Sequence, residues 1–146
     1  MIYYFAYGSN MNFERLKIRD SSANRLGSAF LEGYELVFNK IAKNKQGVSY
    51  ANIQENFNSN VEGILYSLDN LDLLDKFEGF PKEYFRKEIE IIFENKMLKT
   101  WTYIANKDKT GIDIFPEKEY LNHILCGEPF LSKSYFKLIS NIKTFD

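Results

Sequence analysis

The stretch YYFAYGSNM, residues 3–11, decides the reading of the fold, because an aromatic run ends abruptly within it. Residues 2–7 (IYYFAY) are apolar and rich in aromatic side chains, which is typical of a buried strand. Residues 12–16 then read as the start of a helix, with Asn10 or Asn12 as its N-cap. The stretch therefore predicts a strand, a tight turn and a helix in direct succession.

The turn between them consists of Gly8, Ser9 and Asn10. Glycine lets the backbone approach a ligand closely, and the N–H groups at a helix start have no acceptor within the helix. Such a junction is able to hold a carboxylate or an oxyanion. An ordinary turn followed by a helix cap explains the same residues, so the motif alone leaves both interpretations open. Ser9 is a poor candidate nucleophile, because GSN is not a G-x-S-x-G elbow.

Longer alternating segments follow this stretch. Residues 28–40 read as a strand with a break at Gly33, and residues 48–56 and 60–68 read as two more strands. The polar run ENFNSN, residues 55–60, predicts a loop between those two strands.

The period then becomes helical. Residues 69–79 (DNLDLLDKFEG) predict a helix with Asp69 as its N-cap and Gly79 as its C-terminal stop. Residues 85–93 and 97–105 alternate again and predict a hairpin with its tip at Asn95–Lys96.

The tail, residues 117–143, reads as one or two helices. The sum is a mixed α+β fold, in which a strongly curved antiparallel sheet or barrel carries a few helices on its outside.

Composition narrows the classes of function. The 146 residues predict a single domain, residues 1–146, and 19 basic against 20 acidic residues leave no basic surface for nucleic acid or an acidic membrane. One Cys and one His argue against a disulfide framework and against a zinc site. Without a signal peptide or an apolar run of roughly 18–20 residues, we expect a cytoplasmic protein. Nothing in the sequence specifies an oligomeric state.

Glu78 is the candidate catalytic carboxylate. It lies at the predicted end of the 69–79 helix, and Leu74, Phe77 and Phe80 are its apolar neighbours. Burial and the negative end of a helix both disfavour the ionised form, so the pKa of Glu78 should rise. A carboxyl group of raised pKa suits a general base near neutral pH, whereas a solvated carboxylate at a helix end is the ordinary alternative.

Three other polar residues deserve comparison with Glu78. Tyr84 and Tyr120 are each able to donate a phenol hydrogen bond to a ligand, although most of the 10 tyrosines must serve packing. His123 falls in the helical tail, where we expect a surface or packing role.

Several segments, taken in chain order, resemble the γ-glutamylcyclotransferase-like superfamily, and most closely γ-glutamylcyclotransferase: FAYGSNM at 5–11, ER at 14–15, Arg19, VEGILYSL at 61–68, LDKFEG at 74–79 and Tyr84. The resemblance extends from Tyr3 to about Tyr120. It implies a small closed, mostly antiparallel β-barrel with peripheral helices.

The resemblance also implies a reaction, in which a γ-glutamyl-amino acid or γ-glutamylamine is converted to 5-oxoproline and a free amine without metal or cofactor. Glu78 is implied as the catalytic acid/base. The residues implied in substrate binding are Tyr4, Phe5, Ala6, Tyr7, Gly8, Ser9, Asn10, Tyr84 and Tyr120.

Two alternatives remain at this point. The substrate is open among γ-glutamyl-amino acids, γ-glutamylamines, γ-glutamyl-capped intermediates and glutathione, with loops 41–47 and 106–116 as the expected pocket walls. The protein could also be a non-catalytic binding module for a γ-glutamyl or other small carboxylate ligand. Glu78 argues against that module, because a carboxylate beside an anion-binding turn weakens the binding of a carboxylate ligand.

Overall fold

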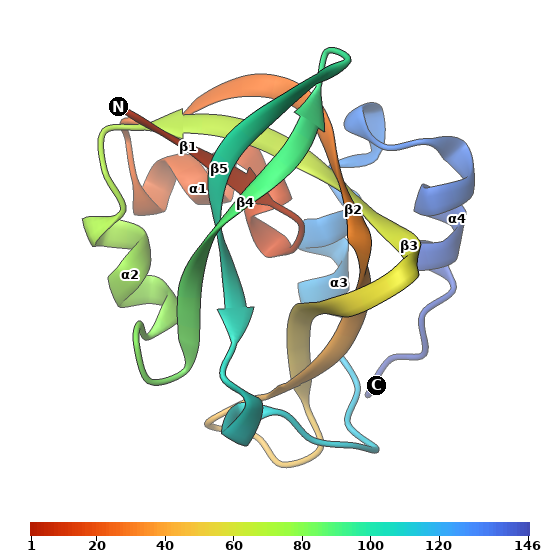
Figure 1. Ribbon diagram of the computed structural model, residues 1–146. Helices are drawn as coiled ribbons and strands as arrows, with labels where there is room; N and C mark the ends of the chain where they lie inside the picture. Colours follow the sequence, from red (N-terminus) through yellow and green to blue (C-terminus); the bar gives the residue numbers. More distant parts are fainter.

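The computed structural model describes residues 1–146 and contains a closed β-barrel (Figure 1). Around the barrel the strands follow the order β1-β3-β2-β4-β5. Their bounds are Ile2–Ala6 (β1), Asn24–Ile41 (β2), Ser49–Leu68 (β3), Tyr84–Phe93 (β4) and Lys96–Ala105 (β5). Every neighbouring pair is antiparallel except β1 and β5, which run parallel and close the barrel where Tyr4 faces Trp101. The expected small, mostly antiparallel barrel is confirmed.

The helices lie outside the barrel (Figure 1). The α-helices are α1 (Phe13–Arg19), α2 (Asp72–Glu78), α3 (Lys118–Leu125) and α4 (Lys133–Ser140). Short 3₁₀ turns are η1 (Ser9–Met11), η2 (Lys107–Lys109) and η3 (Glu128–Phe130). In Figure 1, α1 and α2 lie on the left of the barrel and α4 on its right. None of these helices has the length and apolar character needed to cross a membrane.

The two longest strands correct one prediction. Residues 55–60 lie within the continuous strand β3 and not in a loop between two strands, although only Glu55 and Asn60 among them pair with β2. The pairing register shifts between Tyr34, opposite Glu55, and Glu32, opposite Asn60. The extra residues lie on β3, where residues 56–59 stand opposite the single residue Gly33 of β2, whose φ is 83°. The expected break at Gly33 is therefore a register shift within a continuous strand.

The β4–β5 hairpin forms as predicted, but its tip lies one residue earlier. Glu94 and Asn95 have φ values of 50° and 63°, the left-handed conformation that two-residue hairpin turns require. Ile89 and Ile91 are buried on one face of β4, in agreement with the alternating pattern.

The helix ends position the residues around the turn after β1. The side chain of Asn12 accepts a hydrogen bond from the backbone N–H of Arg15, so Asn12 is the N-cap of α1.

The predicted start of α2 is wrong. Asp69 is not its cap: the N-cap is Leu71, and Asn70 Oδ1 accepts from the backbone N–H of Asp72, the first helical residue, at 2.9 Å. Its predicted end is confirmed, because Gly79 adopts the left-handed conformation with φ 65°. Glu78 is therefore the last helical residue.

Candidate active site

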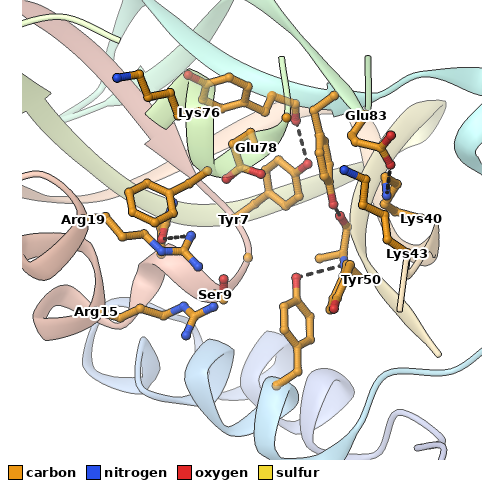
Figure 2. A pocket seen from close by; sticks show the side chains of 18 of the residues that line it. Tyr7, Ser9, Arg15, Arg19, Lys40, Lys43, Tyr50, Lys76, Glu78 and Glu83 are labelled. Carbon is orange, nitrogen blue, oxygen red and sulfur yellow. Dashed lines mark hydrogen bonds and ion pairs between the residues drawn. The ribbon is translucent and has the colours of Figure 1, made fainter. Parts of the chain in front are cut away.

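A cavity of about 320 Å³ lies where the end of β1, helices α1 and α2, and the turn after β2 come together (Figure 2). Its polar lining includes phenols, cations and two acids: Tyr4, Tyr7, Tyr50, Tyr84, Tyr103, Tyr120, Arg15, Arg19, Lys40, Lys43, Lys76, Glu78 and Glu83. Segments far apart in the sequence thus meet around one space, and most of the residues singled out from the sequence are among them.

The turn after β1 contributes to the wall, whereas part of the strand does not. Tyr4, Tyr7, Gly8, Ser9 and Asn10 line the cavity. By contrast, Phe5 and Ala6 do not line it, because their side chains belong to the barrel core, at 0% and 1% exposure. The strand therefore supports the turn through these two residues.

The turn has backbone donors to offer a ligand. The N–H groups of Gly8 and Ser9 donate to no other group of the chain, whereas the Gly8 carbonyl accepts from the Met11 N–H at 3.0 Å. A Cβ at Gly8 would lie 3.6 Å from the Tyr120 hydroxyl oxygen, at the surface of the cavity. The two unpaired N–H groups are available to a bound anion.

Glu78 points from the end of α2 into the cavity beside Tyr7 (Figure 2). Its carboxylate forms no hydrogen bond or ion pair with the chain. Burial raises its pKa to about 7, and the positive charges of Arg19 and Arg15 oppose that rise only in part. The direction agrees with the expectation from the sequence, and the result is a carboxyl group that exchanges protons near neutral pH.

The two predicted tyrosines, Tyr84 and Tyr120, both hydrogen-bond to the backbone of Ala51, but one donates and the other accepts. Tyr84 donates its hydroxyl proton to the Ala51 carbonyl at 2.8 Å. Tyr120 instead accepts from the Ala51 N–H at 3.0 Å, so its own proton remains available. Both side chains line the cavity, but only the Tyr120 phenol is free to donate to a ligand.

Tyr4 and Tyr7 show the same contrast. Tyr7 donates to the Tyr103 carbonyl at 2.6 Å, whereas the Tyr4 hydroxyl accepts from Asn10 Nδ2 at 3.0 Å. Burial followed by the negative charge of Glu78 raises the pKa of both phenols. They stay protonated, and Tyr4 keeps a proton to donate.

Sequence reasoning missed the functional placement of Arg15 and Arg19, which extend from α1 into the cavity (Figure 2). Their four-residue spacing on a helix that directly follows the turn places both on one face, and this was the available signal. It also missed the ion pair of Lys40 with Glu83, 3.1 Å long and buried.

Of the two loops predicted to form walls of the pocket, one does so. The 41–47 loop supplies Lys43 and Asn44, whereas no residue of 106–116 lines the cavity. His123 lies outside the cavity, with its Nδ1 within 3.0 Å of the Asn12 side-chain amide.

A family model described as "Gamma-glutamyl cyclotransferase, AIG2-like" matches residues 4–122. The chain belongs to this family. The resemblance inferred from the motifs is thereby confirmed, over almost the same residues. A comparison with curated proteins finds no match.

Solved structures agree with membership of the γ-glutamyl cyclotransferase family. A structure entitled "Gamma-glutamyl cyclotransferase" superposes with a TM-score of 0.89 at 27% identity, covering 99% of this chain and 89% of the other. The uncharacterized human protein loc79017 superposes at 0.87, also with 27% identity, and the covered shares are again 99% and 89%.

A yeast γ-glutamyl cyclotransferase specific to glutathione shares the fold at a TM-score of 0.66. The identity is 13%, over 94% of this chain and 93% of that one.

Proposed function

We propose that the protein is an enzyme that converts a γ-glutamyl-amino acid or γ-glutamylamine to 5-oxoproline and a free amine. The observation that carries the proposal is Glu78, a carboxylate without a partner that faces the cavity with a pKa raised to about 7. Membership of the γ-glutamyl cyclotransferase family supports the reaction class.

The proposed reaction is an intramolecular acyl transfer. The α-amine of the γ-glutamyl group attacks its own γ-carbonyl carbon, a C–N bond closes the five-membered lactam, and the amide C–N bond to the second amine breaks. Because nucleophile and electrophile belong to one residue, the cavity need only fold the substrate into a near-attack conformer. The residues of the chain supply proton transfer and charge stabilisation.

Glu78 is the proposed acid/base. Near pH 7 it is about half ionised, so it can take a proton from the substrate α-amine and pass one to the departing nitrogen. The free N–H groups of Gly8 and Ser9 offer hydrogen bonds to a negatively charged oxygen of the substrate, either a carboxylate or the tetrahedral oxyanion. Tyr120, with its free proton, is a further donor at the same wall.

The experiment that tests this function is mass spectrometry of γ-glutamyl compounds incubated with the purified protein. The panel contains γ-glutamyl-alanine, γ-glutamyl-ε-lysine and glutathione, and a reaction without protein measures spontaneous cyclisation. We expect 5-oxoproline from at least one compound, at a rate proportional to protein concentration. Binding of a compound without any 5-oxoproline would contradict the enzyme and favour the binding module.

A further inference from the structure

The reaction described above uses none of the five cations that line the cavity. Arg15 and Arg19 lie one turn apart on α1, and Figure 2 shows their guanidinium groups in the cavity near Ser9. Lys40 and Lys43 lie on the other side of the cavity in the same view. The cavity therefore presents positive charge on two walls, with Glu78 between them.

The two arginines lack an acidic partner, in contrast to Lys40 and Arg86. Lys40 is paired with Glu83 at 3.1 Å and Arg86 with Asp75 at 2.8 Å, but neither Arg15 nor Arg19 forms an ion pair. The Nε atom of Arg15 is buried and has no hydrogen-bond partner. A buried guanidinium donor without an acceptor is costly, so this pair is arranged for an anion supplied from outside the chain.

Neutral groups hold Arg19 in place. Its Nη1 atom donates to Asn10 Oδ1 at 3.3 Å, and its guanidinium lies 4.9 Å from the centre of the Phe77 ring. Neither contact neutralises the charge. Burial and the charge of Arg19 lower the pKa of Arg15, and a bound anion would relieve that repulsion. The pair is thus fixed in position while its charge remains available.

The position of the two arginines relative to Glu78 indicates which anion of the substrate they would bind. Arg15, Arg19 and Glu78 line the same cavity, and the positive charges of the two arginines oppose the rise in the pKa of Glu78. In a γ-glutamyl substrate, the α-amine that Glu78 must deprotonate shares its carbon with the α-carboxylate. A carboxylate held by the arginines therefore keeps the amine within reach of Glu78, whereas Lys43, at the rim, lies nearer to solvent.

We propose that Arg15 and Arg19 together bind the α-carboxylate of the γ-glutamyl group and thereby orient its α-amine toward Glu78. The proposal rests on the proposed function and leaves the N–H groups of Gly8 and Ser9 for the oxyanion. The arginines are positioning residues, and the recognised chemistry is a carboxylate next to an amine.

The test compares three ligands that differ by one group each. They are γ-glutamyl-alanine, γ-glutamyl-ethylamide, which lacks the carboxylate of the departing half, and γ-glutamyl-alanine with its glutamyl α-carboxylate replaced by a carboxamide. Calorimetry measures Kd in a Glu78→Gln background, where turnover does not interfere. Arg15→Gln and Arg19→Gln are added singly, and Lys17→Gln, an exposed cation on the same helix, is the matched control.

We expect each arginine substitution to raise Kd for γ-glutamyl-alanine and γ-glutamyl-ethylamide by roughly 10–100-fold. For the carboxamide ligand the change should stay below about threefold, and Lys17→Gln should leave every Kd unchanged within about twofold. Arg15→Gln breaks no hydrogen bond of the chain, so it reports on binding even if Arg19→Gln impairs folding. Thermal melts verify the fold of each variant.

Two patterns would overturn the proposal. Equal losses for all three ligands would mean that the arginines recognise no carboxylate, and a loss that disappears only with γ-glutamyl-ethylamide would place the pair on the departing half. Failure of the proposed function is distinguishable: the wild-type protein would form no 5-oxoproline while the ligand-dependent losses remained. Absence of binding by any ligand would overturn the carboxylate site as well.

Discussion

Glu78 and Glu83 lie five residues apart and line the same cavity, yet their surroundings differ completely. Glu78 has no partner, and burial raises its pKa to about 7. Burial alone would also raise the pKa of Glu83, but the hydrogen bond and charge of Lys40, with help from Lys109 and Lys43, lower it. A buried carboxylate thus becomes a structural anchor or a proton-exchanging group according to whether a cation meets it directly.

The turn at Gly79 produces this difference. The left-handed glycine ends α2 after Glu78, and its carbonyl accepts from the Glu83 N–H at 2.8 Å. One carboxylate is thereby directed into the open cavity and the other toward Lys40 on β2. The same segment supplies both an anchor to the barrel and the candidate base.

The largest effect is expected from Glu78→Gln. The amide cannot exchange protons, so the rate of 5-oxoproline formation should fall by at least about 10²–10⁴-fold while the fold is retained. Steady-state kinetics and thermal melts measure the two properties. Glu90→Gln, at an exposed position on β4, is the matched control. Near wild-type turnover in Glu78→Gln would remove Glu78 from the mechanism.

For Glu83, loss of its cation should lower the stability of the protein. Lys40→Met leaves Glu83 buried with only Lys109, 3.8 Å away, and should lower the free energy of unfolding by about 3–5 kcal/mol. Denaturant unfolding measures this loss, and replacing Glu83 by Leu in the same chain should recover most of it. A loss below about 1 kcal/mol would show that the ion pair does not anchor the turn.

Glu78 and Glu83 should change the stability of the protein with pH in opposite directions. Because the folded-state pKa of Glu78 lies above its unfolded value of 4.5, stability should fall by roughly 1–3 kcal/mol as pH rises from about 4.5 to about 7, and then level off. The lowered pKa of Glu83 acts in the other direction, since its stabilisation is lost as pH falls below about 4.5. Melts from pH 3 to 9 should show both declines, and Glu78→Gln should abolish only the decline between about pH 4.5 and 7.

The smallest predicted effect concerns the two phenols on Ala51. Tyr120→Phe removes a donor with a free proton and should lower kcat/KM by about three- to tenfold. Tyr84→Phe removes a proton already donated to the Ala51 carbonyl, so kcat/KM should change less than about twofold. Each substitution should also cost about 1 kcal/mol of stability, because Ala51 loses a partner. Equal kinetic losses would contradict the distinction.

Local signals in the sequence were sufficient for much of the fold. The strand before Gly8, the cap at Asn12 and the stop at Gly79 depend on neighbouring residues, and all three were predictable. The strand through 55–60 was not, because its side chains are polar and residues 56–59 bulge out of the pairing with β2, so the sequence resembles a loop. Asp69 looked like a cap because Asp is favoured there, but the helix begins at Asp72 after the N-cap Leu71, and Asn70 is the residue that accepts from the Asp72 N–H.

Some residues of the candidate site were also predictable from local sequence, and others were not. Glu78 and the turn at Gly8 carry their own signals, but Phe5 and Ala6 could not be separated from them without knowing which side chains enter the core. Arg15 looks like one more charge on a solvated helix until the cavity beneath it is seen. The pairing of Lys40 with Glu83 depends on barrel closure, which no local pattern encodes.

The most direct test of the central claim is a carbon-13 NMR titration of the glutamate side-chain carboxyls, with Glu78→Gln and Glu83→Gln used to assign the two signals. The account predicts a midpoint close to 7 for Glu78 and one below 4.5 for Glu83 in the same protein. Titration of Glu78 near 4.5, together with Glu83, would contradict it.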